Sequence, residues 1–248
     1  KQIPFKVNMA QKDFLKNNPD LIEGNLDNPW ASGREWLDNQ ECENLTISSY
    51  DGLTLHAYYI AAPSPSSITA VLIHGYTGRG RDMAAIAKYY HEDHGFNVLM
   101  PDCRGHGESE GDYIGFGWHD RFDILRWLDY IIDYSNKEIG EKIKKNVGKT
   151  KDTVDKFENE VKIIIHGVSM GAATALMTGG EKLPENVKLI ISDCAYTSVK
   201  DILSYQLQRM FKLPKFPLIQ ITSLICKLRA GYFFGEASAL AQVRKAGV

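Results

Sequence analysis

The chain has 248 residues, of which 44% are hydrophobic and 24% are charged, a composition typical of a globular protein with one sizeable core. Its formal net charge of −2 gives no broad basic field, so neither nucleic acid nor an anionic membrane is predicted as a partner. The four cysteines lie far apart, unlike those of a zinc site or a disulfide framework. We therefore expect reduced, mostly buried thiols, with a disulfide pair as the alternative, and no metal.

The N-terminal part, residues 1–42, is polar with scattered aromatic residues and predicts a helical segment that packs on a core built later in the chain. No apolar signal segment follows Lys1, so we expect a cytoplasmic protein; the alternative is an anchored or exported protein whose leader was removed. Residues 45–47 and 53–60 are strand-like runs, and the turn Asp51-Gly52 between them predicts an antiparallel hairpin.

Four short apolar runs follow, and they are near-continuous in the manner of buried parallel strands. They lie at residues 70–74, 97–100, 161–166 and 188–192. Helical patterns separate or follow them at residues 82–91, 119–134 and 169–181. This alternation predicts an α/β fold with a doubly wound, mostly parallel sheet that has the N-terminal hairpin at its antiparallel edge. In such sheets the chemistry gathers at the carboxyl ends of the strands.

Two further segments complete the expected organisation. Residues 137–160 carry seven lysines and six acids, which predicts a solvated helix-loop excursion, with a docking surface as the alternative. Residues 198–235 are apolar and helical, and we expect them to form a cap over the active edge of the sheet. The α/β domain is accordingly expected to cover residues 43–248.

The strongest chemical signal is the pentapeptide Gly167-Val168-Ser169-Met170-Gly171, which stands between a predicted strand and a predicted helix. This is the context of a nucleophile elbow, in which a serine sits on a strained strand-to-helix turn. Glycines at positions 167 and 171 would allow strand and helix to approach closely. The pattern therefore predicts Ser169 as a nucleophile; the alternative is a simple tight turn.

A second signal is the glycine-rich segment His74-Gly75-Tyr76-Thr77-Gly78, which ends the strand before it. Acyl transfer needs two backbone N–H donors for the oxyanion of the tetrahedral intermediate. We expect these donors to be the N–H groups of Met170 and Tyr76, and His74 to brace the loop rather than act as a base. An ordinary strand-to-loop exit is the alternative.

A third segment, residues 101–109, is dense in glycine and charge but lacks the residue order of a phosphate-binding loop. We interpret it as a structured loop held by Asp102, Arg104 and His106. A catalytic role for His106 is the alternative.

Together the segments HGYTG, PDCRGHGES, GVSMG and SDCAYTS resemble, in order and spacing, the α/β-hydrolase superfamily. The resemblance covers about residues 43–240 and is closest to the bacterial serine esterase-like branch related to the cinnamoyl and feruloyl esterases. It implies Ser169 as nucleophile, the amides of Tyr76 and Met170 as oxyanion donors, and a cap after Asp193 that shapes the substrate pocket.

The pattern departs from this family at the triad, whose order along the chain is serine, acid, histidine. All seven histidines precede Ser169, so we expect the acid and the histidine, with the last strands of the sheet, in about 50 to 70 further residues after Val248. The chain as given would then be inactive or weak, because a serine without a base is a poor nucleophile. Asp193 is an alternative acid.

The sequence thus predicts a serine hydrolase of carboxylic esters that forms an acyl-serine intermediate and uses no metal or organic cofactor. The apolar cap favours a small ester with an apolar or aromatic part. Peptidase, thioesterase and acyltransferase activities on the same site remain alternatives. A non-catalytic scaffold or binding protein is the rival from another class. The sequence does not indicate an oligomeric state.

Overall fold

The computed structural model describes residues 29–146 and 161–246. It contains a six-stranded sheet in the order β1-β2-β4-β3-β5-β6, in which β1-β2 and β2-β4 are antiparallel and the remaining pairs are parallel. The strands are β1 (Glu43–Ser48), β2 (Thr54–Ile60), β3 (Ile68–Ile73), β4 (Asn97–Pro101), β5 (Lys162–Val168) and β6 (Val187–Asp193). The predicted parallel sheet with an antiparallel N-terminal hairpin at its edge is therefore confirmed.

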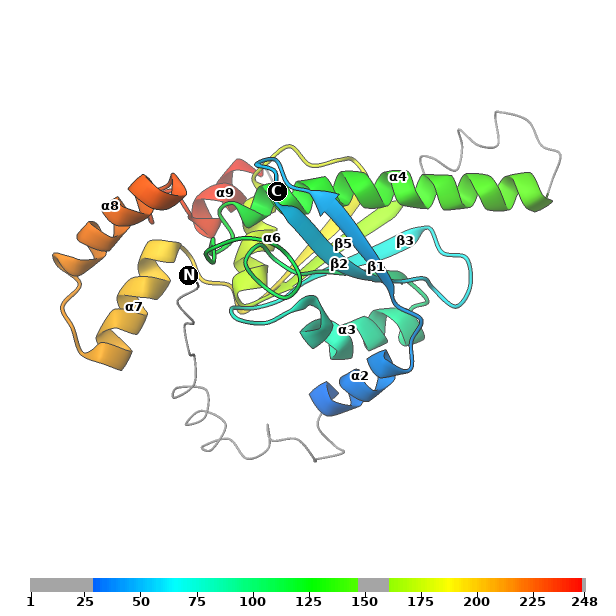
Figure 1. Cartoon of the computed structure of the whole chain (residues 1–248), viewed down its shortest axis with the longest axis horizontal. Coiled ribbons are helices and arrows are strands. Elements are labelled where there is room, and N and C mark those ends of the chain that lie inside the picture. Colours follow the sequence, from blue (N-terminus) through cyan, green and yellow to red (C-terminus); the bar gives the residue numbers. More distant parts are fainter. Residues whose placement is uncertain (1–28, 147–160, 247–248) are drawn as a thin grey trace.

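The helical elements lie before, between and after these strands along the chain (Figure 1). They are α2 (Pro29–Asp38), η2 (Gly80–Met83), α3 (Ala84–Lys88), η3 (Tyr89–Asp93), α4 (Asp120–Asn146), α6 (Met170–Gly179), α7 (Val199–Phe211), α8 (Leu218–Ala230) and α9 (Ala239–Lys245). In the described part of the chain, no helix combines the length and the hydrophobicity that crossing a membrane would require.

Helices cover both faces of the central strands, as their sequences require, whereas no residue of the edge strand β6 is buried. In β2, Ala57 and Tyr59 point into a cluster with α4 and α6, whereas Tyr58 and Ile60 point into a cluster with α2 and α3. Figure 1 shows α2 and α3 on one side of the sheet and α4 on the other. The period of two along β2 explains this doubly wound arrangement.

The end of the predicted N-terminal segment packs on the sheet through α2. Trp36 and Leu37 are buried in the cluster that faces α3, and Gly33 approaches the backbone of Ala84 and Ala85 so closely that a Cβ there would collide with it. The rest of that segment lies outside the described residues, so the domain boundary at residue 42 stays a prediction.

Two helix predictions differ from the structure. The helix expected over residues 82–91 is instead the succession η2, α3 and η3, which begins earlier because the Asp82 carboxylate accepts the Arg79 N–H at 2.9 Å. The helix expected to end at residue 134 continues as α4 to Asn146, through a stretch rich in the helix formers lysine and glutamate. The helix thus takes up the first part of the predicted helix-loop excursion, and residues 147–160 lie outside the described part.

Candidate active site

The turn from β5 to α6 places Ser169 at the carboxyl end of the sheet, half-buried and in an unusual conformation. Its backbone has φ 56° and ψ −111°, a region that non-glycine residues avoid. The Ser169 N–H donates to the Asp193 carbonyl at 2.8 Å, which ties the turn to the end of β6. A strained backbone at a serine between a strand and a helix is the feature expected of a nucleophile elbow.

The two glycines around Ser169 are required by close backbone approach. A Cβ on Gly167 would overlap the carbonyl oxygen of Gly171, and a Cβ on Gly171 would overlap the carbonyl oxygens of Ile73 and His74. Neither neighbour can move away, because both are backbone atoms of the sheet or of α6. The strand, the turn and the helix are therefore locked together around the serine.

The glycine-rich loop after β3 lies directly beside this serine. A Cβ built on Gly75 would be 3.4 Å from Cβ and 3.9 Å from Oγ of Ser169. In the described part of the chain, the N–H groups of Tyr76 and Met170 have no hydrogen-bond acceptor. The Met170 N–H also opens α6, where the helix dipole favours negative charge. Both N–H groups are thus open, and their role as an oxyanion hole stays a prediction.

His74 braces this loop, as expected, through both ring nitrogens. Its Nδ1–H donates to the Gly75 carbonyl at 2.8 Å, and its Nε2 accepts the Cys103 N–H at 3.0 Å. Burial lowers the pKa of His74 to about 4, so the ring is neutral at pH 7 and can accept that N–H. This tautomer holds the loops after β3 and β4 together.

The loop over residues 101–109 is held by its own polar side chains, as predicted. The buried Asp102 carboxylate accepts N–H groups from Gly80 at 2.7 Å and from Glu108 at 3.0 Å, and it contacts His56 Nδ1 at 3.2 Å. The ring of His106 is buried, and its Nδ1–H donates to the Arg104 carbonyl at 3.0 Å. His106 is therefore committed to the loop, which disfavours its catalytic alternative.

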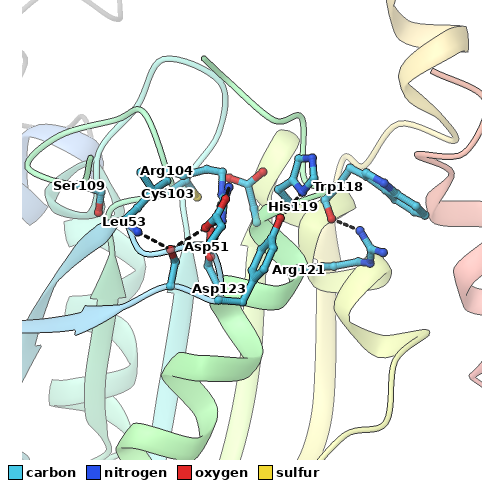
Figure 2. A network of polar contacts seen from close by, with 12 residues as sticks. Asp51, Leu53, Cys103, Arg104, Ser109, Trp118, His119, Arg121 and Asp123 are labelled. Atoms are coloured by element: carbon cyan, nitrogen blue, oxygen red, sulfur yellow. Dashed lines mark hydrogen bonds and ion pairs between the residues drawn. The ribbon is translucent and has the colours of Figure 1, made fainter. Parts of the chain in front are cut away.

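Arg104 links this loop to two other elements through a buried ion-pair network (Figure 2). Its guanidinium donates to both oxygens of Asp123 at 2.6 and 2.7 Å and to both oxygens of Asp51 at 2.9 and 3.1 Å. Burial raises the pKa of Asp123 to about 6 despite Arg104, whereas hydrogen bonds from Arg104 lower the pKa of the more exposed Asp51. The hairpin turn, the loop and α4 are thus joined by one arginine.

Phe116 is a residue near the site that the sequence analysis missed. Its ring stacks on the exposed ring of Tyr76 with centroids 5.6 Å apart, and its backbone has φ 50°. The Tyr196 hydroxyl donates to the Phe116 carbonyl at 2.7 Å. The flanking glycines at positions 115 and 117 were the available signal, since glycines on both sides of an aromatic residue indicate a constrained turn.

No described hydrogen bond joins a histidine to Ser169. Six of the seven histidines bond to other groups, and His94 lies against the rings of Tyr89 and Phe96. The six are His56, His74, His91, His106, His119 and His166. The geometry therefore agrees with the expectation that the base is not among these histidines.

Asp193 ends β6 beside Val168, the residue before the nucleophile. Its carbonyl holds the Ser169 N–H, and its side chain is exposed. The Asp193 charge partly offsets the lowering of the His166 pKa by burial, but no hydrogen bond joins Asp193 to a histidine in the described part of the chain. Its role as an alternative acid stays a prediction.

All four cysteines are free, but only Cys103 is buried and Cys194 is exposed, so the expectation of mostly buried thiols was wrong. Cys194 follows the strand end directly, where the chain leaves the sheet.

Comparison with known sequences points to one family. The family model described as "Serine aminopeptidase, S33" matches residues 65–227. The uncharacterized protein YqkD of Bacillus subtilis (strain 168) is 31% identical over 232 residues, which make up 93% of this chain and 67% of YqkD.

Comparison with solved structures gives the fold. The esterase Pf2001 of Pyrococcus furiosus matches with a TM-score of 0.51 and 23% identity, over 71% of this chain and 60% of that chain. In another crystal form the TM-score is 0.54 and the identity 20%, over 84% of this chain and 66% of that chain. The chain thus spans about 60% of the esterase's length in the first comparison. The likeness shows the α/β-hydrolase fold, and the narrower resemblance to cinnamoyl and feruloyl esterases stays a prediction.

Proposed function

We propose that this chain, which belongs to the serine aminopeptidase S33 family of α/β hydrolases, takes part in the hydrolysis of small carboxylic esters through an acyl-Ser169 intermediate. The observation that carries the proposal is the strained backbone of Ser169 at a strand-to-helix turn, beside the open N–H groups of Tyr76 and Met170. A strained conformation persists only where the surrounding structure holds it, as the close approach of Gly167 and Gly171 does here.

In the proposed reaction Ser169 Oγ attacks the ester carbonyl carbon while a base takes the hydroxyl proton. The carbonyl oxygen becomes an oxyanion that accepts hydrogen bonds from the Tyr76 and Met170 N–H groups. Collapse of this intermediate expels the alcohol with a proton, and water then releases the acid and restores the serine. The proposal needs no metal and no organic cofactor. Since none of the seven histidines forms a described hydrogen bond with Ser169, we propose that the base lies outside them.

The substrate we propose is a small ester with an apolar or aromatic part. Its support is the pair of stacked rings, Tyr76 and Phe116, of which Tyr76 directly follows Gly75 beside the nucleophile, and the esterase name of the Pyrococcus furiosus neighbour. A cavity of about 220 Å³ also lies against the Tyr76 loop and Val168, and the charged residues Arg34 and Asp82 line its other side. A peptidase is the second candidate, because the matching family model is described as an aminopeptidase.

The test is covalent labelling of the full-length protein with a fluorophosphonate. We expect wild type to label and Ser169→Ala to lose all labelling, while the matched control Ser192→Ala, an exposed serine at the end of β6, labels like wild type. Labelling of Ser169→Ala at the wild-type level would exclude this nucleophile. A protein that labels at no residue would support the scaffold alternative.

One further measurement separates the remaining alternatives. Hydrolysis of a p-nitrophenyl ester is expected to exceed hydrolysis of an aminoacyl p-nitroanilide, and the reverse order would favour the peptidase.

A further inference from the structure

Helices α7 and α8 form a hairpin that extends away from the sheet and turns back at its far end (Figure 1). Residues 209–216, at the turn, are here called the cap tip. All of them are exposed, including Phe211, Leu213 and Phe216, whose side chain is 74% exposed. Apolar residues at the tip of a projecting hairpin are removed from the core and cannot stabilise it in the described structure.

A second apolar surface lies on α8, next to the cap tip along the chain. The exposed residues recur with the spacing of one helix face, i, i+3, i+4 and i+7, and Leu228 is 78% exposed. They are Ile221, Leu224, Ile225 and Leu228, here called the α8 stripe. Only Ile219 on this helix is buried. The stripe and the tip therefore form an exposed apolar surface of the kind that marks an interaction site.

The charge of this hairpin is opposite to that of the rest of the protein. Residues 202–235 contain five cationic side chains and no carboxylate, whereas the whole chain has a net charge of −2, which leaves −7 on the remainder. Three of the cations lie in the cap tip, among its apolar side chains: Arg209, Lys212 and Lys215. The overall charge of the chain, from which no membrane partner was predicted, conceals this asymmetry.

From these observations we propose that the cap tip and the α8 stripe dock on an anionic lipid surface. The apolar and aromatic side chains would enter the boundary between headgroups and acyl chains, and the interspersed cations would bind the headgroup phosphates. Stable attachment at an interface takes both contributions, and here both lie on one hairpin. A symmetric contact between two cap tips would instead bring the three cations Arg209, Lys212 and Lys215 against the same three of the other copy, which is unfavourable without added anions.

Docking in this way would also orient the candidate active site. The base of the cap packs on α6, where Ile219 and Phe234 join a cluster with Ala173 and Met177. Because α6 begins directly after Ser169, a membrane bound at the hairpin would lie in a fixed relation to that residue. The docking itself does not depend on the proposed ester hydrolysis, and it is tested by binding rather than by activity.

The experiment is cosedimentation of the full-length protein with phosphatidylcholine vesicles, with and without phosphatidylserine. We expect binding to the anionic vesicles to be at least tenfold stronger than to phosphatidylcholine alone, and to weaken as salt is raised. Ser169→Ala should bind like wild type, so that failure of the proposed hydrolysis leaves this result intact. Equal, weak binding to both vesicles would overturn the proposal.

Variants locate the binding surface. The double change Lys212→Gln, Lys215→Gln is expected to reduce partitioning about tenfold or more, whereas the matched control Lys162→Gln, Lys182→Gln changes it by less than twofold. An equal loss of partitioning in the two double variants would show that the vesicles attract the overall positive charge rather than the cap tip, and would overturn the assignment.

The apolar contribution is tested in the same assay. Phe211→Ser with Phe216→Ser is expected to reduce partitioning at least fivefold, while Leu240→Ser on α9, also exposed, leaves it unchanged. If the aromatic changes instead convert a dimer to a monomer in sedimentation velocity without affecting vesicle binding, a second copy is the occupant and the lipid proposal is wrong. Circular dichroism of each variant confirms that the fold is intact.

Discussion

Helices α6 and α8 are both short and apolar, yet they are packed in opposite ways. Nine of the ten residues of α6 are buried, whereas on α8 only Ile219 is buried among thirteen. Small residues in α6 allow the backbones of β3 and β5 to approach it, and this close packing holds Ser169 in its strained conformation. The large side chains of α8 instead face outward. Apolar residues therefore make α6 rigid through close packing, whereas on α8 they remain exposed as a surface for binding.

The largest effect that would sharpen this comparison is expected from Gly171→Ala. Its Cβ would overlap backbone carbonyl oxygens of Ile73 and His74, so the variant is expected to lose more than about 4 kcal/mol of unfolding free energy or to fail to fold. The measurement is urea unfolding. The matched control is Gly235→Ala after α8, where a Cβ would meet no atom within 4 Å, and it should change stability by less than about 0.5 kcal/mol.

The next effect concerns the buried network of Arg104 near the site. Arg104→Met leaves Asp123 buried without its partner, which is expected to cost about 3 to 5 kcal/mol. Arg81→Met, at an ion pair whose side chains are 39% and 70% exposed, serves as the control and should cost less than about 1 kcal/mol. Equal costs in the two variants would show that burial of the network does not matter.

The pH dependence of this effect follows from the pKa of Asp123. The folded pKa is about 6, above the ordinary 3.8, so the folded protein binds more protons than the unfolded chain between these values. Stability contributed by this carboxyl is therefore lost as pH rises through that window. Because Arg104 opposes the rise in pKa, its removal should widen the window, and Arg104→Met should lose more stability at pH 8 than at pH 5. Urea midpoints at the two pH values check this.

The sequence predicted the parts of the molecule that depend on local patterns. All six strands and the glycine requirement at positions 167 and 171 followed from apolar periodicity and from one pentapeptide. Asp51 was predicted only as a turn residue, because its pairing with Arg104 spans 53 positions and leaves no local pattern. Phe116 was missed although Gly115 and Gly117 indicate a constrained turn, because its partners Tyr76 and Tyr196 are distant along the chain.

For the cap, the sequence predicted the helices but not which of their residues are exposed. Its apolar helices were correctly expected from the sequence, and their placement as a cap over the active edge stays a prediction. The sequence could not show which apolar faces are exposed, since an apolar face has the same pattern whether another element covers it or not. Phe211 and Phe216 are exposed in the described structure, although their residue types suggest a core. Charge within the hairpin was diluted in the net charge of the whole chain. A net charge counted separately for each segment would have shown that the hairpin is positive and the rest of the chain negative.

A smaller effect is expected at Phe116, which packs where α6 and α8 meet. Phe116→Ala removes the ring that stacks on Tyr76 and should slow fluorophosphonate labelling about tenfold, because the proposed oxyanion donor is held less firmly. Phe116→Tyr keeps the ring and should label at the wild-type rate. Phe233→Ala, an exposed aromatic of the cap, is the control. If Phe116→Ala lowered the unfolding free energy but left the labelling rate unchanged, the role of Phe116 would be structural alone.

The smallest effect is expected on α8 itself, where two isoleucines allow the comparison within one helix. Ile219 is 6% exposed and packs against α6, so Ile219→Ala should cost about 2 kcal/mol or more. Ile221 is 51% exposed, and Ile221→Ala should cost less than about 0.5 kcal/mol, because the side chain gains little on folding. Urea unfolding at two protein concentrations measures both. If Ile221→Ala cost as much as Ile219→Ala, the α8 stripe would be covered in solution, and a cost that grows with concentration would identify the cover as a second copy. A small, concentration-independent cost leaves the stripe open for the lipid surface.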